Sequence, residues 1–154
     1  MGCDIHLHPE VQDNGTWCRV TDYPRHVFDA SLPCNVERDA FDRRHAELVD
    51  SGEWNMGRNY RFFARLAGVR NYDNEYQPLF EFRGTPADVS PSTKTTCSQW
   101  GMNAHSHTWA TVRELLDEQL MHLGGDQWQA ILGELVHIRS GDLDSVRVVF
   151  WFDN

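Results

Sequence analysis

The chain has 154 residues, of which 40% are hydrophobic, and its formal net charge is −9 at pH 7. This length favours a single domain over 1–154, and the apolar content excludes a disordered chain. The negative charge repels phosphate backbones, so we expect no nucleic acid polymer as a partner, whereas a compact nucleotide can still bind in a local pocket. No apolar run reaches membrane-spanning length, so no membrane partner is expected.

The four cysteines have no C-x-x-C spacing; they are Cys3, Cys18, Cys34 and Cys97. The hairpin register derived below does not pair Cys3 with Cys18. We therefore predict reduced thiols in a cytoplasmic protein.

The N-terminal stretch 4–11 alternates between polar and apolar residues, which predicts a half-buried strand. Its polar side carries Asp4, His6, His8 and Glu10. Asn14-Gly15 is typical of a type I′ turn, and it predicts a hairpin with 16–20 in which Glu10 faces Arg19.

Further along the chain, capping residues and apolar spacing predict a surface helix over 36–50 and a core-facing helix over 59–67. A possible short strand follows over 79–83. Ser90-Pro91 begins another helix, which ends at Gly101, and 102–109 is predicted to be a loop.

Thr111 and Glu114 form a capping-box pattern at the start of a helix that ends at Gly124-Gly125, and a second helix follows and stops at Ser140-Gly141. The last element, 146–152, is apolar on both faces except for Arg147, as expected for a central strand. The predicted fold class is α+β. A small, mostly antiparallel sheet, made of the N-terminal hairpin and the buried C-terminal strand as possible neighbours, packs against several helices.

The pattern Asp4-x-His6-x-His8 is the sharpest chemical feature. Side chains two residues apart on a strand share a face, about 6–7 Å apart, so two imidazoles and a carboxylate can converge on Zn or Mn. This sequence pattern is similar to the first-strand His-x-His motif of amidohydrolases and of polymerase-and-histidinol-phosphatase-type phosphoesterases. The similarity concerns the local chemistry only. The alternative is a solvated strand face with a Glu10–Arg19 ion pair.

Two further clusters complete the candidate site. His105, Ser106, His107, Thr108 and Trp109 precede a helix, where an anion is favoured and where Ser106 or Thr108 can instead act as a cap. Trp109 can stack on a base or pack in the core. Asp153, at the end of the last strand, can ligate the metal or orient a histidine. Arg147 can pair with a buried carboxylate such as Asp4, or bind a ligand phosphate.

Several segments together resemble a family of small, uncharacterised proteins of tailed bacteriophages and some bacteria. The resemblance rests on the opening Met-Gly-Cys-Asp-Ile-His, on 66–71, on 105–109 and on the closing Phe-Trp-Phe-Asp-Asn. It implies a phage accessory protein in the host cytoplasm. By analogy of setting, such a protein would act in host-defence evasion by degrading or sequestering a nucleotide signal.

The first functional hypothesis is a metal-dependent, phosphodiesterase-like hydrolase of a small phosphate-containing molecule, plausibly a nucleotide, with no organic cofactor. Its metal ligands would be Asp4, His6, His8, His105 and Asp153. Glu10 or His107 would serve as acid or base, and Arg147, Ser106, Thr108 and Trp109 would bind the ligand. Two alternatives stay open: a non-catalytic protein that sequesters a nucleotide, and an interaction module for a host protein. A homo-oligomer is compatible with each.

Overall fold

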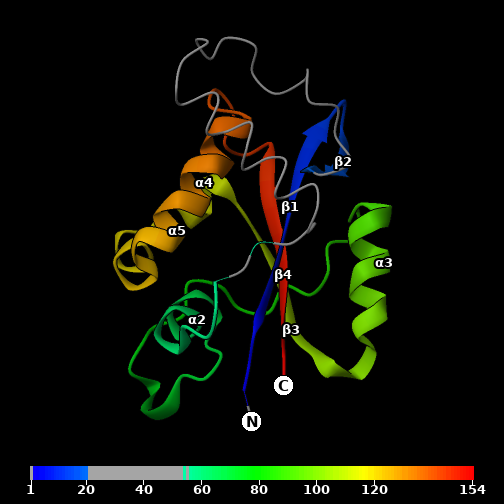
Figure 1. Cartoon of the computed structure of the whole chain (residues 1–154). Helices are drawn as coiled ribbons and strands as arrows, with labels where there is room; N and C mark the ends of the chain where they lie inside the picture. Colours follow the sequence, from blue (N-terminus) through cyan, green and yellow to red (C-terminus); the bar gives the residue numbers. More distant parts are fainter. Residues whose placement is uncertain (1, 21–53, 55) are drawn as a thin grey trace.

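The computed structural model describes residues 2–20, 54 and 56–154. These residues form an α+β fold around a four-stranded antiparallel sheet with the order β2-β1-β4-β3. Figure 1 shows this sheet nearly edge-on, with α2, α4 and α5 on one side, α3 on the other, and both chain termini at the same end of the strands. The predicted fold class is therefore confirmed. The helix predicted over 36–50 and Cys34 lie outside the described residues.

The N-terminal hairpin has the predicted register. Strand β1 (Ile5–Asp13) pairs with β2 (Thr16–Arg19), and Glu10 lies opposite Arg19. Asn14 and Gly15 have φ angles of 49° and 78°. Positive φ at both turn residues is what a type I′ turn requires, so the local Asn-Gly signal fixes which residues of β1 share a face.

Strand β4 (Val146–Asp153) lies in the middle of the sheet, between β1 and β3, and is antiparallel to both. Its residues up to Phe152 are buried, as the apolar run predicted. Strand β3 (Ala104–Thr111) corrects the prediction of a loop over 102–109. A register shift between His105 and Thr108 interrupts the alternation that would have revealed it, and pairing with β4 supplies the order that the local sequence lacks.

On one side of the sheet lie α2 (Tyr60–Ala67), α4 (Val112–Leu115) and α5 (Glu118–Ile138). Apolar side chains from these helices and from the sheet form one core cluster among the described residues; its largest fully buried members include Trp128, Phe62, Phe63, Phe150, Phe152, Leu120 and Leu135. Helix α3 (Pro91–Trp100), capped by Ser90 as predicted, lies on the other side, and short 3₁₀ turns occur at Tyr72–Asn74 and Gly101–Asn103.

Two predicted elements differ in detail. The segment 79–83 is not a strand, since the backbone N–H of Leu79 bonds to the carbonyl of Arg65 in α2. The predicted helix from Thr111 to Gly124 is split, because Asp117 accepts a hydrogen bond from the backbone N–H of Leu120 and begins a new helix. Across the residues that the structure describes, every helix is too short or too polar to cross a membrane.

Candidate functional site

The polar row, defined as Asp4, His6, His8 and Glu10, begins just before β1 and lies on the face of the sheet toward α3. Trp100 of α3 contacts His6, and Ser90 at the start of α3 donates to Glu10. The last three members of the row are buried, with exposed fractions of 6% for His6, 1% for His8 and 0% for Glu10. Trp100, at the end of α3, has its ring centroid 4.1 Å from that of His6. Polar groups covered in this way need partners within the protein, so the partner of each one limits the chemistry it can perform.

Glu10 and Arg147 form the closed end of the row. One oxygen of Glu10 accepts a hydrogen bond from Arg147 Nε at 2.8 Å, and the other accepts one from the backbone N–H of Ser90 at 2.8 Å. Arg147 also donates to Asp88 at 2.8 Å, and it lies 4.0 Å from the centre of the Trp17 ring. Because Arg147 is only 2% exposed, the pair neutralises its charge inside the protein and holds the start of α3 against the sheet.

The closed end changes three sequence interpretations. Arg147 pairs with Glu10 rather than with Asp4, because Glu10 and Arg147 are direct partners in the β1–β4 register. Glu10, expected to be an acid or base, accepts bonds from Arg147 and Ser90 in the interior. Arg19, expected to pair with Glu10, donates to His8.

His8 occupies the middle of the row. Its Nδ1 lies 2.7 Å from Nη2 of Arg19. A guanidinium can only donate, so Nδ1 accepts and the ring is neutral. The imidazole also stacks on Trp151, with ring centroids 4.3 Å apart and an interplanar angle of 11°. These contacts fix the ring between a cation and an indole.

Asp4, His6 and Asp153 form the open end of the row. Nε2 of His6 lies 3.0 Å from one carboxylate oxygen of Asp153, and the other oxygen accepts the backbone N–H of Asp4 at 3.0 Å. A carboxylate only accepts, so Nε2 of His6 carries the hydrogen. The side chains of His6 and Asp153 are 8% and 16% exposed. The histidine is therefore packed against Trp100 yet joined to a carboxylate that reaches the surface.

Asp4 itself points to Arg58. Its two carboxylate oxygens accept hydrogen bonds from Nε and Nη2 of Arg58 at 3.0 and 3.2 Å. This contact lowers the pKa of Asp4 below its usual value, chiefly through the hydrogen bond and secondarily through the positive charge. The carboxylate is thus kept ionised beside the His6–Asp153 pair.

The histidines of β3 lie on opposite faces of the sheet. His105 stacks near Phe152, on the core side, and its Nδ1 is 2.9 Å from the hydroxyl of Ser106. Ser106 has a φ of 54°, and the register shift beside it turns His107 toward Trp151, with ring centroids 6.2 Å apart. Burial lowers the pKa of His107, and the nearby His105 lowers it further.

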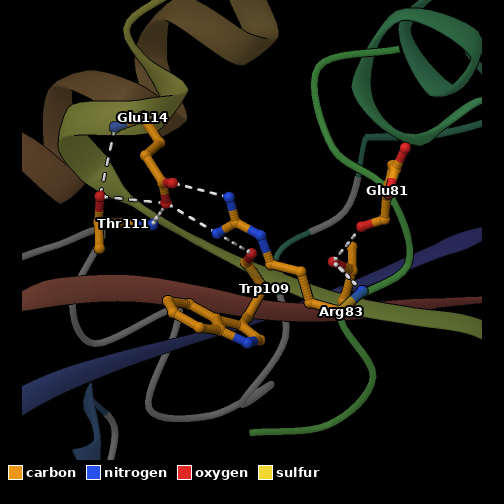
Figure 2. Close-up of polar contacts among 6 residues, drawn as sticks. Glu81, Arg83, Trp109, Thr111 and Glu114 are labelled. Atoms are coloured by element: carbon orange, nitrogen blue, oxygen red, sulfur yellow. Dashed lines mark hydrogen bonds and ion pairs between the residues drawn. The ribbon is translucent and has the colours of Figure 1, made fainter.

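Thr108 and Trp109 contact the segment 81–83. The Thr108 hydroxyl, which is buried, donates to the carbonyl of Glu81 and accepts the backbone N–H of Arg83. Arg83 donates to both carboxylate oxygens of Glu114, at 2.7 and 3.0 Å, and its guanidinium lies 4.9 Å from the centre of the Trp109 ring (Figure 2). Thr108, expected to bind a ligand, thus has internal partners, and Trp109 stacks on the guanidinium of Arg83.

The predicted set of five metal ligands is not assembled in one place. His105 faces the core side, Nδ1 of His8 accepts from Arg19, and Asp4 is held by Arg58. Only Asp4, His6 and Asp153 adjoin one another. In the part of the chain that the structure describes, no three His, Cys, Asp or Glu side chains are arranged to hold a metal ion. A bound Zn or Mn stays a prediction of the sequence, and it would require Arg58 to release Asp4.

Sequence reasoning missed three residues of the site: Arg58, Trp100 and Trp151. Trp151 has the same strand parity as Asp153 and could have been placed from that alternation. Trp100 ends a predicted helix, and no pattern indicates which strand that helix covers. Arg58 precedes the cap of α2 at Asn59 and follows no periodicity.

A hollow of 460 Å³ lies elsewhere in the molecule. It is lined by Ala67, Gly68, Pro78, Phe80, Glu81 and Phe82. Glu81 is its one ionisable group, so the hollow offers little acid–base chemistry by itself. We therefore build the functional argument on the open end of the polar row.

Comparison with known proteins gives no further guide. A scan against protein-family models found no match, and searches of curated proteins and of solved structures found no significant similarity. The proposal below therefore rests on the geometry of the chain itself.

Proposed function

We propose that this chain is a hydrolase acting on a small phosphate-containing molecule, with the His6–Asp153 pair as its acid–base group. The observation that carries the proposal is the 3.0 Å contact between Nε2 of His6 and the Asp153 carboxylate, beside the ring of Trp100. A histidine oriented by a carboxylate and held by an aromatic ring is a recurrent arrangement for proton transfer.

In this proposal His6 takes a proton from the attacking water and returns one to the leaving oxygen. Asp153 orients the imidazole and stabilises the imidazolium that forms while the proton is held. His107, whose pKa burial lowers, is neutral near pH 7 and adds a second proton acceptor on the same face.

The substrate is small rather than polymeric. A net charge of −9 repels an extended polyanion over its whole length, whereas a small phosphate can bind through a few local donors, such as Arg58 at the open end. Among the described residues no three His, Cys, Asp or Glu side chains are arranged to hold a metal ion, so this proposal assigns no step to a metal.

The test is a screen of phosphate monoesters and diesters, including nucleotides, with product identification by liquid chromatography. His6→Gln and Asp153→Asn should each lower the rate by about 100-fold or more, the contribution typical of general acid–base catalysis. His122→Gln, which alters an exposed histidine of α5, is the matched control and should leave the rate unchanged. Parallel assays in chelator, with and without added Mn²⁺, test the metal prediction.

Two outcomes would contradict the proposal: no ester is consumed, or His6→Gln is as active as the unaltered protein. A ligand that binds and is recovered intact after heat denaturation would support the sequestering alternative instead. Binding of a protein partner that is insensitive to His6→Gln would support the interaction module.

A further inference from the structure

The exposed Arg58–Asp4 ion pair lies at the open end of the polar row. Arg58 donates to both oxygens of Asp4, at 3.0 and 3.2 Å, and the two side chains are 60% and 43% exposed. This is a forked contact between a guanidinium and a carboxylate, formed where solvent can compete for it. The buried Arg147–Glu10 pair, with side chains 2% and 0% exposed, has no such access.

The Arg58–Asp4 pair is continuous with the proposed acid–base group. The backbone N–H of Asp4 donates to Asp153, and the backbone N–H of Asp153 donates to the carbonyl of Asp4 at 3.1 Å. Asp153 in turn contacts His6. The hydrogen bond to Asp4 and the charge of Asp4 are the main causes that raise the pKa of Arg58, and the charge of Asp153 adds a smaller contribution.

Gly2 shapes the position of the guanidinium. A Cβ atom added to Gly2 would clash with Cζ of Arg58. The guanidinium therefore occupies the space that a side chain at position 2 would fill. Because the obstructing atoms belong to the end of a flexible side chain, Gly2→Ala should displace Arg58 without removing its charge.

We propose that Arg58 is the phosphate-recognising residue of the site, and that the carboxylate of Asp4 pairs with Arg58 until a phosphate displaces it. This inference rests on the proposed function and names the group of the substrate that is bound. The planar fork of a guanidinium fits phosphate oxygens as well as it fits a carboxylate. A dianionic phosphate monoester carries more negative charge than the carboxylate of Asp4, so it competes for Arg58 more strongly than carboxylates or phosphodiesters do.

Arg58 thereby replaces Arg147 as the residue expected to bind phosphate. Arg147 would have to leave Glu10 in the interior to reach a ligand, which would leave a buried charge without its partner. Arg58 exchanges one exposed anion for another and leaves no buried group behind.

The test measures binding of inorganic phosphate and of phenyl phosphate by calorimetry at low ionic strength, without any requirement for turnover. Arg58→Ala should weaken binding by about tenfold or more, as expected for loss of a forked, charge-assisted contact. Arg58→Lys should recover part of that loss, because a lysine keeps the charge but not the fork.

Three further variants sharpen the result. Asp4→Asn should strengthen binding, because it removes the competing carboxylate. Gly2→Ala should weaken it, because Arg58 is displaced. Arg61→Ala is the matched control: it removes the same charge from an exposed position on α2 and should change binding by about twofold or less, since screening weakens distant exposed charges.

The proposal is overturned if the unaltered protein binds neither probe, if Arg58→Ala binds phosphate as well as the unaltered protein, or if Arg58→Ala and Arg61→Ala lose affinity equally. Equal losses would mean that phosphate responds to the overall electrostatic field of the protein and not to a specific site at Arg58. Failure of the proposed hydrolase can be told apart from failure of this inference. If phosphate binding depends on Arg58 but there is no turnover, or turnover is insensitive to His6→Gln, the proposed enzyme activity is contradicted and the phosphate-binding role of Arg58 is retained.

Discussion

Each end of the polar row contains an arginine–carboxylate pair, but one pair is buried and the other is exposed to solvent. At the closed end, Glu10 and Arg147 neutralise each other with exposed fractions of 0% and 2%. At the open end, Asp4 and Arg58 form an ion pair in solvent, with one guanidinium nitrogen on each carboxylate oxygen, next to His6 and Asp153. The difference lies in what covers them. Residues at the start of α3 cover one end, whereas the other lies at the end of the strands where the two chain termini are found (Figure 1).

This contrast separates a structural role from the proposed chemical role along one row of side chains. A buried ion pair fixes geometry because breaking it is costly, and the same cost prevents it from exchanging partners. An exposed pair adds little net stability, and so it can exchange. The histidines follow the same division: His8 is fixed as a neutral acceptor of Arg19, whereas His6 faces a carboxylate that can stabilise its charged form.

The largest expected effect is at the closed end. Arg147→Met should lower the free energy of unfolding by about 3–5 kcal/mol, because Glu10 is left as a buried charge without its cation. Urea denaturation measures this directly. The double variant Glu10→Leu/Arg147→Met should recover much of the loss, because no buried charge remains. An Arg147→Met protein as stable as the unaltered chain would mean that the closed end is not sealed.

A smaller stability effect is expected at the open end. Asp153→Asn should cost about 1.5–3 kcal/mol of unfolding free energy, the range for a hydrogen bond to a charged group. The proposed activity should nevertheless fall more here than in Arg147→Lys, which is farther from His6 along β4. Equal activity losses in the two variants, once corrected for the folded fraction, would abolish the distinction between the ends.

The smallest effect concerns His107 and pH. Burial lowers the pKa of this residue, so the unfolded chain binds the proton more readily than the folded one. The stability contribution is present above the unfolded pKa, about 6.5, and is lost as the pH falls through the lowered folded value. His107→Gln should therefore reduce the drop in unfolding free energy between pH 7.5 and pH 5.5. An unchanged drop would place the ring in solvent.

Much of the fold was predictable from local signals. Asn14-Gly15 predicted the hairpin register, and the apolar run 146–152 predicted the central strand. Strand β3 was not predictable, because its bulge at Ser106 breaks the alternation and its pairing depends on β4. For the site, alternation predicted that His6 lies on the polar side of its strand, and Asp153 was expected to ligate a metal or orient a histidine; the structure joins it to His6. The sequence pattern did not predict that α3 covers the polar row or that Asp4 contacts Arg58, because both contacts join segments far apart in sequence.

The measurement that tests the central claim most directly is a map of backbone amide chemical shifts during titration with phenyl phosphate. The amides of Asp4, His6 and Asp153 should shift with a common saturation curve, while those of Glu10 and Arg147 stay in place. Shifts centred on Glu10 and Arg147, or the absence of any saturable shift at the open end, would contradict the assignment of chemistry to one end of the row and of structure to the other.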